Sequence, residues 1–289
     1  MEPSTSFDVD RVRSALAGTR FGDVRWGAET GSTNADLLAL AAQGEPEGIV
    51  LGADHQTAGR GRRGRTWTAP PGAAVLVSVL ARPPAPAVEL VLPAMAVAAA
   101  EAVEQVCGVA PGIKWPNDLV VPAAGGGPDR KLAGLLAEVA WPPGADVASG
   151  WAPPPAGQRV TVVGGMGLNV RAAGRAPELE GLAVACDELG GGVPSREDLV
   201  AAWLGRLDHW YRCAVGVARG GDDDGPGRLW EAWRARSATL GRRVRIDLGA
   251  DDVEGQAVDV TPEGRLVVRT LAGEDRTLAV GDVTHLRPA

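Results

Sequence analysis

The sequence predicts an α+β fold that is followed by a small β-barrel of the SH3 kind. Helix-like and strand-like segments alternate along most of the chain, and one long apolar helix is expected at 88–106. After Ser237 the pattern changes, because four short strand-like segments separated by turn signals follow within about 50 residues. We therefore expect two domains, residues 1–236 and residues 237–289.

Short apolar runs and the polar residues between them define the elements of the N-terminal half. In chain order we expect a helix at 8–17, a strand at 24–28, a helix at 35–42, a strand at 49–53, a Gly/Arg-rich loop at 57–72, a strand at 74–80 and the helix at 88–106. Ser32 stands just before the second helix, where a hydroxyl can cap it. Glutamate and proline residues interrupt the apolar helix, which predicts a core helix of a soluble protein rather than a membrane span.

The C-terminal half is assigned in the same way. In chain order we expect two strands of a hairpin at 113–121 and 131–139 with a Gly/Pro-rich loop at 122–128 between them, a Pro/Gly-rich surface loop at 141–158, a strand with a glycine kink at 160–170, a helix at 195–217, an acidic linker at 220–227, a helix at 229–236 and strands at 244–246, 253–260, 266–269 and 277–280. Ser195 opens the long helix, and Glu197 and Asp198 in its first turn suit the positive end of the helix dipole.

The composition argues against several classes of protein. The net charge of −7 disfavours a general nucleic-acid binder, because phosphate binding favours a basic surface. The three cysteines form no Cys-x-x-Cys pair, so neither a zinc site nor a disulfide framework is indicated, and a reducing cytoplasm fits. The N-terminal segment has acidic residues and no apolar run, so no signal peptide is expected. Lysine occurs only at Lys114 and Lys131 in an arginine-rich chain, which suggests two places where a compact ammonium group matters.

The first motif that suggests chemistry is the sequence GRGRRGR at residues 59–65. Glycine allows the backbone to approach a phosphate closely, and arginine offers permanently charged, bidentate donors for phosphate oxygens. Four arginines repel one another when no ligand is bound, so we expect this loop to be mobile and to become ordered on an anionic ligand. The alternative is a flexible basic arm that binds RNA, although such arms usually lie at chain termini.

Each of the two lysines stands in a motif of its own. In Lys-Trp-Pro-Asn-Asp, Lys114 can meet a phosphate, and Asn117 and Asp118 can hold a ribose, a metal ion or another side chain. Lys131 opens an otherwise apolar strand, where its ammonium group can neutralise a carboxylate and a phosphate together. Gly134 lets a ligand lie against the backbone. The alternatives are a turn-like kink with surface polar groups and a solvated lysine at the end of a strand.

Two further segments suggest close contact with a ligand. The run Gly-Gly-Met-Gly-Leu-Asn at 164–169 puts three glycines into a strand, which predicts close approach of a ligand or of another backbone. Ser32, Thr33 and Asn34 offer hydroxyls and backbone N–H groups to a polar ring. The alternatives are a simple β-bulge in the strand and plain helix capping at Ser32.

In this order and spacing, the motifs resemble those of the biotin–protein ligases, over a stretch from about residue 30 to residue 170. The expected C-terminal barrel agrees with that family. The resemblance implies a mixed β-sheet backed by helices, related to the lipoate ligases. It also implies an enzyme that forms biotinyl-5′-AMP from biotin and MgATP and then transfers biotin to a lysine of a carrier protein.

The resemblance also implies the role of individual residues. The catalytic residues would be Lys131, Arg62 and Lys114. The biotin site would comprise Ser32, Thr33, Asn34, Gln56, Gly59, Arg60, Gly61, Arg62, Lys131 and Gly134. The nucleotide site would comprise Arg62, Arg63, Arg65, Trp67, Lys114, Asn117, Lys131 and Asn169, with Gly165 and Gly167 in the strand that lines it. Mg²⁺ would arrive with ATP, and Asp118 is the carboxylate expected nearest to it.

The resemblance further implies a partner, the biotin carboxyl carrier domain of an acetyl- or acyl-CoA carboxylase. Many bacterial relatives carry an N-terminal helix-turn-helix domain, but about 20 residues before the first strand are too few for one. We therefore expect no DNA binding, no membrane contact, a cytoplasmic location, and a monomer or weak homodimer. The remaining alternatives are a lipoate or octanoyl ligase, an RNA-binding or regulatory protein, and an inactive biotin sensor.

Overall fold

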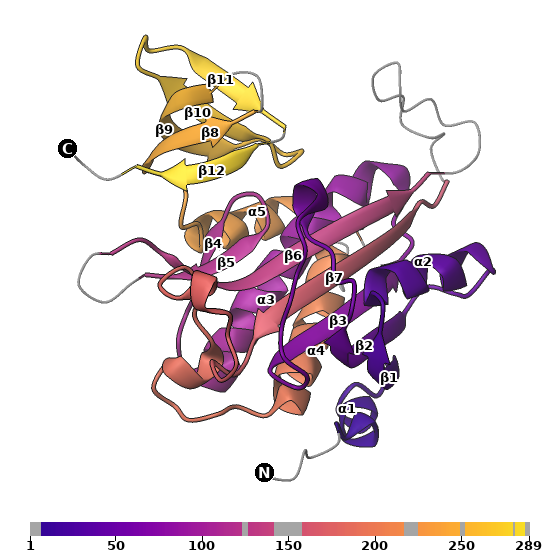
Figure 1. The fold of residues 1–289 in the computed structure, drawn as a ribbon. Coiled ribbons are helices and arrows are strands. Elements are labelled where there is room, and N and C mark those ends of the chain that lie inside the picture. Colours follow the sequence, from indigo (N-terminus) through magenta and orange to yellow (C-terminus); the bar gives the residue numbers. More distant parts are fainter. Residues whose placement is uncertain are drawn as a thin grey trace.

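A seven-stranded mixed β-sheet forms the centre of the molecule (Figure 1). The computed structural model describes residues 7–122, 127–141, 158–216, 225–248, 252–279 and 281–286. The strands are β1 (Asp23–Thr30), β2 (Ile49–Gln56), β3 (Ala74–Ala81), β4 (Gly112–Lys114), β5 (Asp118–Val121), β6 (Arg130–Ala140) and β7 (Thr161–Asn169). Their order is β1-β2-β3-β7-β6-β5-β4, with β1 and β2 parallel and all other neighbours antiparallel.

Helices cover one face of this sheet and leave much of the other face to a loop. The helices α3 (Val91–Cys107), α4 (Arg196–Ala214) and α5 (Gly225–Ala235) lie behind the sheet in Figure 1. Alternate residues of β3, such as Val77 and Val79, join the main core, because successive side chains of a strand point to opposite faces. Leu80 packs with Leu37 of α2 (Thr33–Ala42) in a second, smaller cluster. The short helix α1 (Val9–Ala15) contacts α4 and β1.

The long apolar helix is a core helix, as the sequence predicts. It begins with a 3-10 turn at Ala85–Leu90 and continues as α3. The whole segment Ala85–Cys107 is long and apolar enough to cross a membrane by composition alone, but 78% of its most apolar window is buried inside the protein. Burial on this scale is typical of a helix that packs against a sheet and a neighbouring helix.

The C-terminal residues form a second, separate sheet of five antiparallel strands. Its strands are β8 (Arg243–Asp247), β9 (Asp252–Val260), β10 (Leu266–Thr270), β11 (Asp275–Leu278) and β12 (Asp282–His285), in the order β11-β10-β9-β8-β12. Alternate apolar residues such as Val244, Ile246 and Val268 are fully buried. The four predicted strands are confirmed, and β12 is a fifth that the sequence pattern did not indicate. Closure into an SH3-like barrel stays a prediction.

The structure corrects two other predictions. Residues 113–121 are not one strand, because a turn at residues 115–117 separates β4 from β5 and Lys114 faces Asp118 across the resulting hairpin. Pro116 has no N–H to donate to a ladder, which explains why the strand ends there. The glycine kink expected at 160–170 is absent, because β7 pairs with β3 and β6 in unbroken register. The loop predicted at 141–158 and the linker at 220–227 fall mostly outside the described residues, as does part of the loop at 122–128.

Candidate active site

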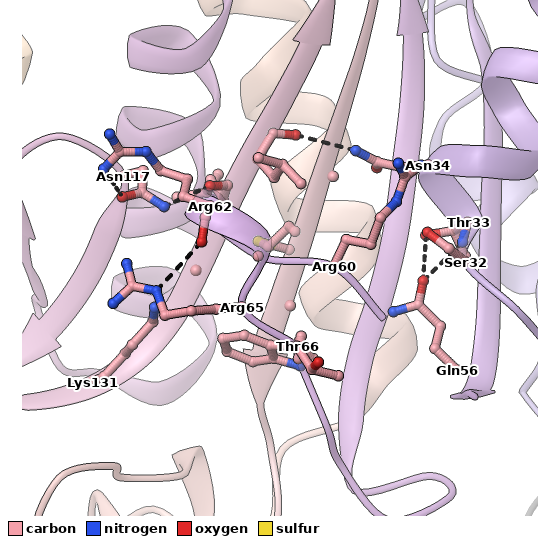
Figure 2. Close-up of a pocket in the computed structure, with 18 residues that line it drawn as sticks. Ser32, Thr33, Asn34, Gln56, Arg60, Arg62, Arg65, Thr66, Asn117 and Lys131 are labelled. Atoms are coloured by element: carbon pink, nitrogen blue, oxygen red, sulfur yellow. Dashed lines mark hydrogen bonds between the residues drawn. The ribbon is translucent and has the colours of Figure 1, made fainter. Parts of the chain in front are cut away.

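The arginine-rich loop lies over the face of the sheet that is opposite to α3 and α4 (Figure 1). A pocket opens between this loop and the sheet (Figure 2). Side chains and backbone from five separate segments of the chain meet there. The lining residues are Ser32, Thr33, Asn34, Gln56, Arg60, Gly61, Arg62, Arg65, Thr66, Trp67, Asn117, Lys131, Gly134, Leu135, Leu136, Gly165, Met166 and Gly167. The structure therefore brings together most of the residues that the sequence singled out.

The floor of the pocket is an indole ring that lies on glycines of β6 and β7. A Cβ atom at Gly167 would come within 2.4 Å of the ring of Trp67, and one at Gly134 within 3.0 Å. Any side chain at Gly167 would thus push the ring away from the sheet. The close approach that the glycines predicted is real, but their partners are protein side chains: Gly164 faces Met95 and Gly165 faces Asn34.

Lys131 is held at the edge of this floor by four contacts. Its Nζ lies 2.7 Å from Oδ1 of Asp118 and 5.4 Å from the centre of the Trp67 ring. Its backbone N–H donates to the carbonyl of Leu182 at 2.8 Å, and its own carbonyl accepts from Val184 at 2.9 Å. Lys131 is therefore a positioned cation rather than a solvated lysine at the end of a strand. Asp118 holds a side chain, which is one of the three roles expected for it.

A buried polar network forms the opposite end of the pocket. The backbone N–H of Thr33 donates to Oε1 of Gln56 at 2.8 Å, and the hydroxyl of Thr33 lies 2.7 Å from that of Ser78. Ser78 donates to Oδ1 of Asn34 at 2.6 Å, and Nδ2 of Asn34 donates to Glu138 at 2.7 Å. Because Thr33, Asn34 and Ser78 are almost fully buried, each polar group needs such a partner, and the network fixes their orientation.

Ser32 also acts as the N-cap of α2, because its hydroxyl accepts from the N–H of Ala35 at 3.5 Å. Capping and pocket lining therefore coexist at this helix start. Ser78 and Glu138 were not predicted as site residues from the sequence. A lone serine in the otherwise apolar strand β3 was the only local signal for the first. Glu138 stands at the end of the lysine-led motif of β6, but its partners come from α2 and from the loop.

The arginines of the loop are neutralised by carboxylates from elsewhere in the fold. Arg60 pairs with Glu138 of β6 at 3.1 Å, and Arg62 lies 3.7 Å from the carboxylate of Asp282 and also donates to the amide oxygen of Asn117 at 3.3 Å. Arg65 donates to Asp282 of the C-terminal sheet at 3.2 Å. We expected the arginines to repel one another until an anion binds, but these carboxylates already reduce that repulsion. Burial lowers the pKa of Arg62, although an arginine remains charged at neutral pH.

Five of the predicted residues do not line the pocket itself. Gly59 lies at the base of the loop, where its carbonyl accepts from the N–H of Trp67 at 3.0 Å. Arg63 turns outward to the backbone carbonyl of Asp247 at 3.0 Å. Asn169 is used structurally, since its Nδ2 donates to the carbonyl of Val184 at 3.2 Å. The remaining two residues, Lys114 and Asp118, face each other across the hairpin of β4 and β5.

Lys114 is mostly buried next to the charged edge of the pocket. Burial lowers the pKa of its ammonium group, and the nearby Lys131 lowers it further, whereas Asp118, Asp129 and Asp282 act in the opposite direction. Within the described ranges, Lys114 has no ion-pair partner within 4 Å of its nitrogen. It therefore adds positive potential to the lysine end of the pocket from a distance and does not form part of its wall.

Among the residues that the structure describes, no group of three or more His, Cys, Asp or Glu side chains converges as a metal site. Mg²⁺ that accompanies a nucleotide needs fewer protein ligands, because phosphate oxygens and water supply most of its coordination shell and one or two carboxylates complete it. Asp118 lies at the lysine end of the pocket and is chemically suited to that part. The residues present therefore fit a Mg²⁺ that enters with its nucleotide.

Comparison with known proteins identifies the family. The family model "Biotin/lipoate A/B protein ligase family" matches residues 26–145, and the model "Biotin protein ligase C terminal domain" matches residues 239–286. The biotin–[acetyl-CoA-carboxylase] ligase of Mycobacterium tuberculosis is 38% identical over 291 residues, which cover 96% of this chain and 94% of that protein. The chain belongs to the biotin protein ligase family.

Two further similar proteins support the same family assignment. The biotin–[acetyl-CoA-carboxylase] ligase of Paracoccus denitrificans is 33% identical over 262 residues, which cover 85% of this chain and 94% of that protein. A biotin protein ligase from Aquifex aeolicus, solved in complex with biotin and ATP, has a TM-score of 0.67 at 22% identity and covers 93% of this chain and 100% of its own. At 22% identity, the similarity to the Aquifex aeolicus structure shows only that the two proteins share a fold.

Proposed function

We propose that this ligase joins biotin and ATP into biotinyl-5′-AMP and pyrophosphate, and then transfers the biotinyl group to a lysine of a carrier domain. The named relative from Mycobacterium tuberculosis, similar over nearly the full length, supports this assignment. The observation that carries it is the convergence of Lys131, Arg60, Arg62 and Arg65 on one pocket floored by Trp67. Two anionic substrates cannot meet unless the site supplies positive charge of this kind.

The pocket has two chemically different ends, which suit the two substrates (Figure 2). We assign the buried network around Thr33, Asn34 and Gln56 to the polar ring of biotin, because it offers both donors and acceptors out of contact with water. We assign the end at Lys131 and Asn117 to the nucleotide, with the adenine against Trp67. Arg60 pairs with Glu138 at the first end, and Arg62 and Arg65 lie at the second end, so the carboxylate and the α-phosphate would meet between these arginines.

In the first step the biotin carboxylate attacks the α-phosphorus of ATP and pyrophosphate leaves. Lys131 and Arg62 would reduce the repulsion between the two anions and stabilise the charge that develops on the phosphate oxygens. The chain needs no covalent nucleophile for this step, because holding the reactants in line already removes much of the barrier. Mg²⁺, held by the phosphates and by Asp118, would supply Lewis-acid charge when it is bound.

In the second step the carrier lysine attacks the acyl carbon of the adenylate and AMP leaves. Water would compete for the same mixed anhydride, so the loop at 59–65 must cover it until the carrier arrives. Asp118 lies within reach of the lysine end of the pocket and would help to orient or deprotonate the incoming amine. The Mg²⁺ role and the amine role of Asp118 belong to different steps and do not conflict.

The direct test is to incubate the protein with ATP, Mg²⁺, biotin and a carrier domain and to follow the carrier by mass spectrometry. We expect a mass increase of one biotinyl group that requires ATP. A lipoate or octanoyl ligase would instead modify its carrier with those acids, and an inactive biotin sensor would bind biotin without modifying anything. Salt-sensitive retention of RNA on filters, with no modification of the carrier, would favour the RNA-binding alternative.

Several broader assignments rest on the same proposal. The acceptor is proposed to be the carrier domain of an acetyl- or acyl-CoA carboxylase, in agreement with the names of the relatives. We also propose a cytoplasmic location without DNA or membrane binding, a monomer or weak homodimer, and a domain boundary at residues 236 and 237. Sedimentation of the protein with and without biotin and ATP would test the oligomeric state.

A further inference from the structure

The C-terminal sheet presents a pair of carboxylates to the loop that covers the pocket. Asp282 begins β12 and Asp247 ends β8, and the two residues face each other in the register of these strands. Figure 1 shows the tip of the loop reaching the side of the C-terminal sheet on which β12 lies. Side by side and without counter-ions, two carboxylates repel each other, so this edge of the sheet favours cationic partners.

Three arginines of the loop, Arg62, Arg63 and Arg65, lie close to this pair of carboxylates. Asp282 lies 3.2 Å from Arg65, 3.5 Å from Arg63 and 3.7 Å from Arg62, measured between carboxylate oxygens and guanidinium nitrogens. Arg63 also lies 3.6 Å from the carboxylate of Asp247. The Asp282 side chain is 31% exposed, so water screens these pairs only in part.

The same contacts connect the C-terminal sheet with the reaction centre. Arg62, whose side chain is only 19% exposed, donates to the carbonyl of Gly281 at 3.4 Å and to Oδ1 of Asn117 at 3.3 Å. Asn117 in turn donates to the carbonyl of Leu135 at 2.8 Å, on the strand that carries Lys131. The backbone at Arg63 has a positive φ of 54°, a conformation that costs a non-glycine residue free energy and needs outside contacts to persist.

We propose that Asp282, assisted by Asp247, is a positioning residue that latches the arginine-rich loop over the pocket. Asp282 does not line the pocket, so it would act through the arginines and not on the substrates. Its carboxylate reduces the repulsion among the loop arginines and keeps Arg62 and Arg65 turned toward the lysine end of the pocket. The C-terminal sheet thereby sets how long a bound adenylate is retained, an inference that rests on the function proposed above.

The first test needs no substrate. Hydrogen–deuterium exchange of the peptide that spans residues 60–67 is compared in the wild-type protein, in Asp282→Asn and in Asp275→Asn. Asp275 is a matched control, because it pairs with Arg269 at 2.9 Å on the same sheet and away from the loop. We expect about fivefold to tenfold faster exchange in Asp282→Asn only, the effect of losing a partly screened charge network. Equal exchange in all three proteins would overturn the latch.

The second test measures retention of the intermediate. Preformed, radiolabelled biotinyl-5′-AMP should leave Asp282→Asn about fivefold to tenfold faster than the wild-type protein, and Asp282→Glu, which keeps the charge, should restore much of the retention. Melting temperatures verify that each variant is folded. Unchanged release from Asp282→Asn, or faster release with unchanged exchange of the loop, would overturn the latch. If the wild-type protein makes no adenylate, the proposed function fails, while the exchange experiment still decides the latch.

Discussion

Lys131 is the residue on which the proposed chemistry depends most directly. Its ammonium group is fixed by Asp118 and lies over Trp67, so under the proposed function it would meet a bound phosphate without reorganising. We expect Lys131→Ala to lower the rate of pyrophosphate release in the presence of biotin and ATP by roughly 10²–10³-fold. Arg130→Ala is the control, because its ion pair with Glu188 lies outside the pocket. A rate within threefold of wild type in Lys131→Ala would contradict the assignment.

Gly167 allows a second test at a single position. A methyl group there would meet the Trp67 ring at 2.4 Å, so we expect Gly167→Ala to displace the ring. Displacing the floor of the nucleotide end should raise the KM for ATP roughly tenfold or more, while stabilisation of the protein by biotin alone should change little. Gly205→Ala on α4 is the control, since nothing lies within 4 Å of the added atom. An unchanged KM for ATP in Gly167→Ala would contradict the assignment of Trp67 to the nucleotide site.

At the scale of single elements, the cap of α4 stabilises the fold without contacting the pocket. Ser195 accepts from the N–H of Asp198 at 3.2 Å at the start of this helix, which packs on α3 behind the sheet. We expect Ser195→Ala to lower the free energy of unfolding in urea by about 1 kcal/mol. The rate of adenylate formation should stay the same, because the pocket lies on the other face. Ser14→Ala, inside α1, should change stability by less than about 0.5 kcal/mol. Equal losses in both variants would argue against the cap.

Elements with a strong local signal were predictable from the sequence, and those shaped by tertiary contacts were not. The cap at Ser195 and the apolar core helix follow from residues within one turn or one window, and both are confirmed. Residues 113–121 were assigned as one strand, with a turn-like kink only as the alternative, because the apolar residues on both sides of one proline resemble a continuous strand. The strand β12 was missed for the opposite reason. Its four residues carry only one fully apolar side chain, Val283, and pairing with β8 defines it.

At the scale of the whole molecule, the site depends on partners that are far apart in the chain. The sequence identified Lys131 and the arginines by their chemistry, but it offered no signal for Glu138 or Asp282 as the carboxylates opposite them. Asp282 lies more than 200 positions from the loop it contacts, so only the fold brings it there. Residues with distinctive chemistry that line the pocket are therefore easier to predict than the residues that hold those side chains in place.

A second long-range contact connects the C-terminal sheet to the turn between β4 and β5. His285 of β12 lies 3.1 Å from Asp129 and 3.2 Å from the hydroxyl of Thr239, which in turn accepts from the N–H of Trp115. The His285 side chain is only 12% exposed, and burial lowers its pKa. Lys114 and Arg242 lower this pKa further, against the opposite effect of Asp129.

This lowered pKa makes the stability of the contact depend on pH. In the unfolded chain the imidazole takes up a proton near its ordinary pKa of about 6.5, whereas the folded protein resists that proton. The free energy of unfolding should therefore fall as the pH drops below about 6.5, by at most about 1.4 kcal/mol per pH unit from this group.

His285→Gln should be less stable at pH 7.5, because Asp129 loses a donor, and should lose less stability on acidification to pH 5.5. Urea denaturation at both pH values measures the difference, and His209→Gln on the exposed side of α4 is the control. If His285→Gln and the wild-type protein lost equal stability on acidification, the buried imidazole would not be the group that titrates.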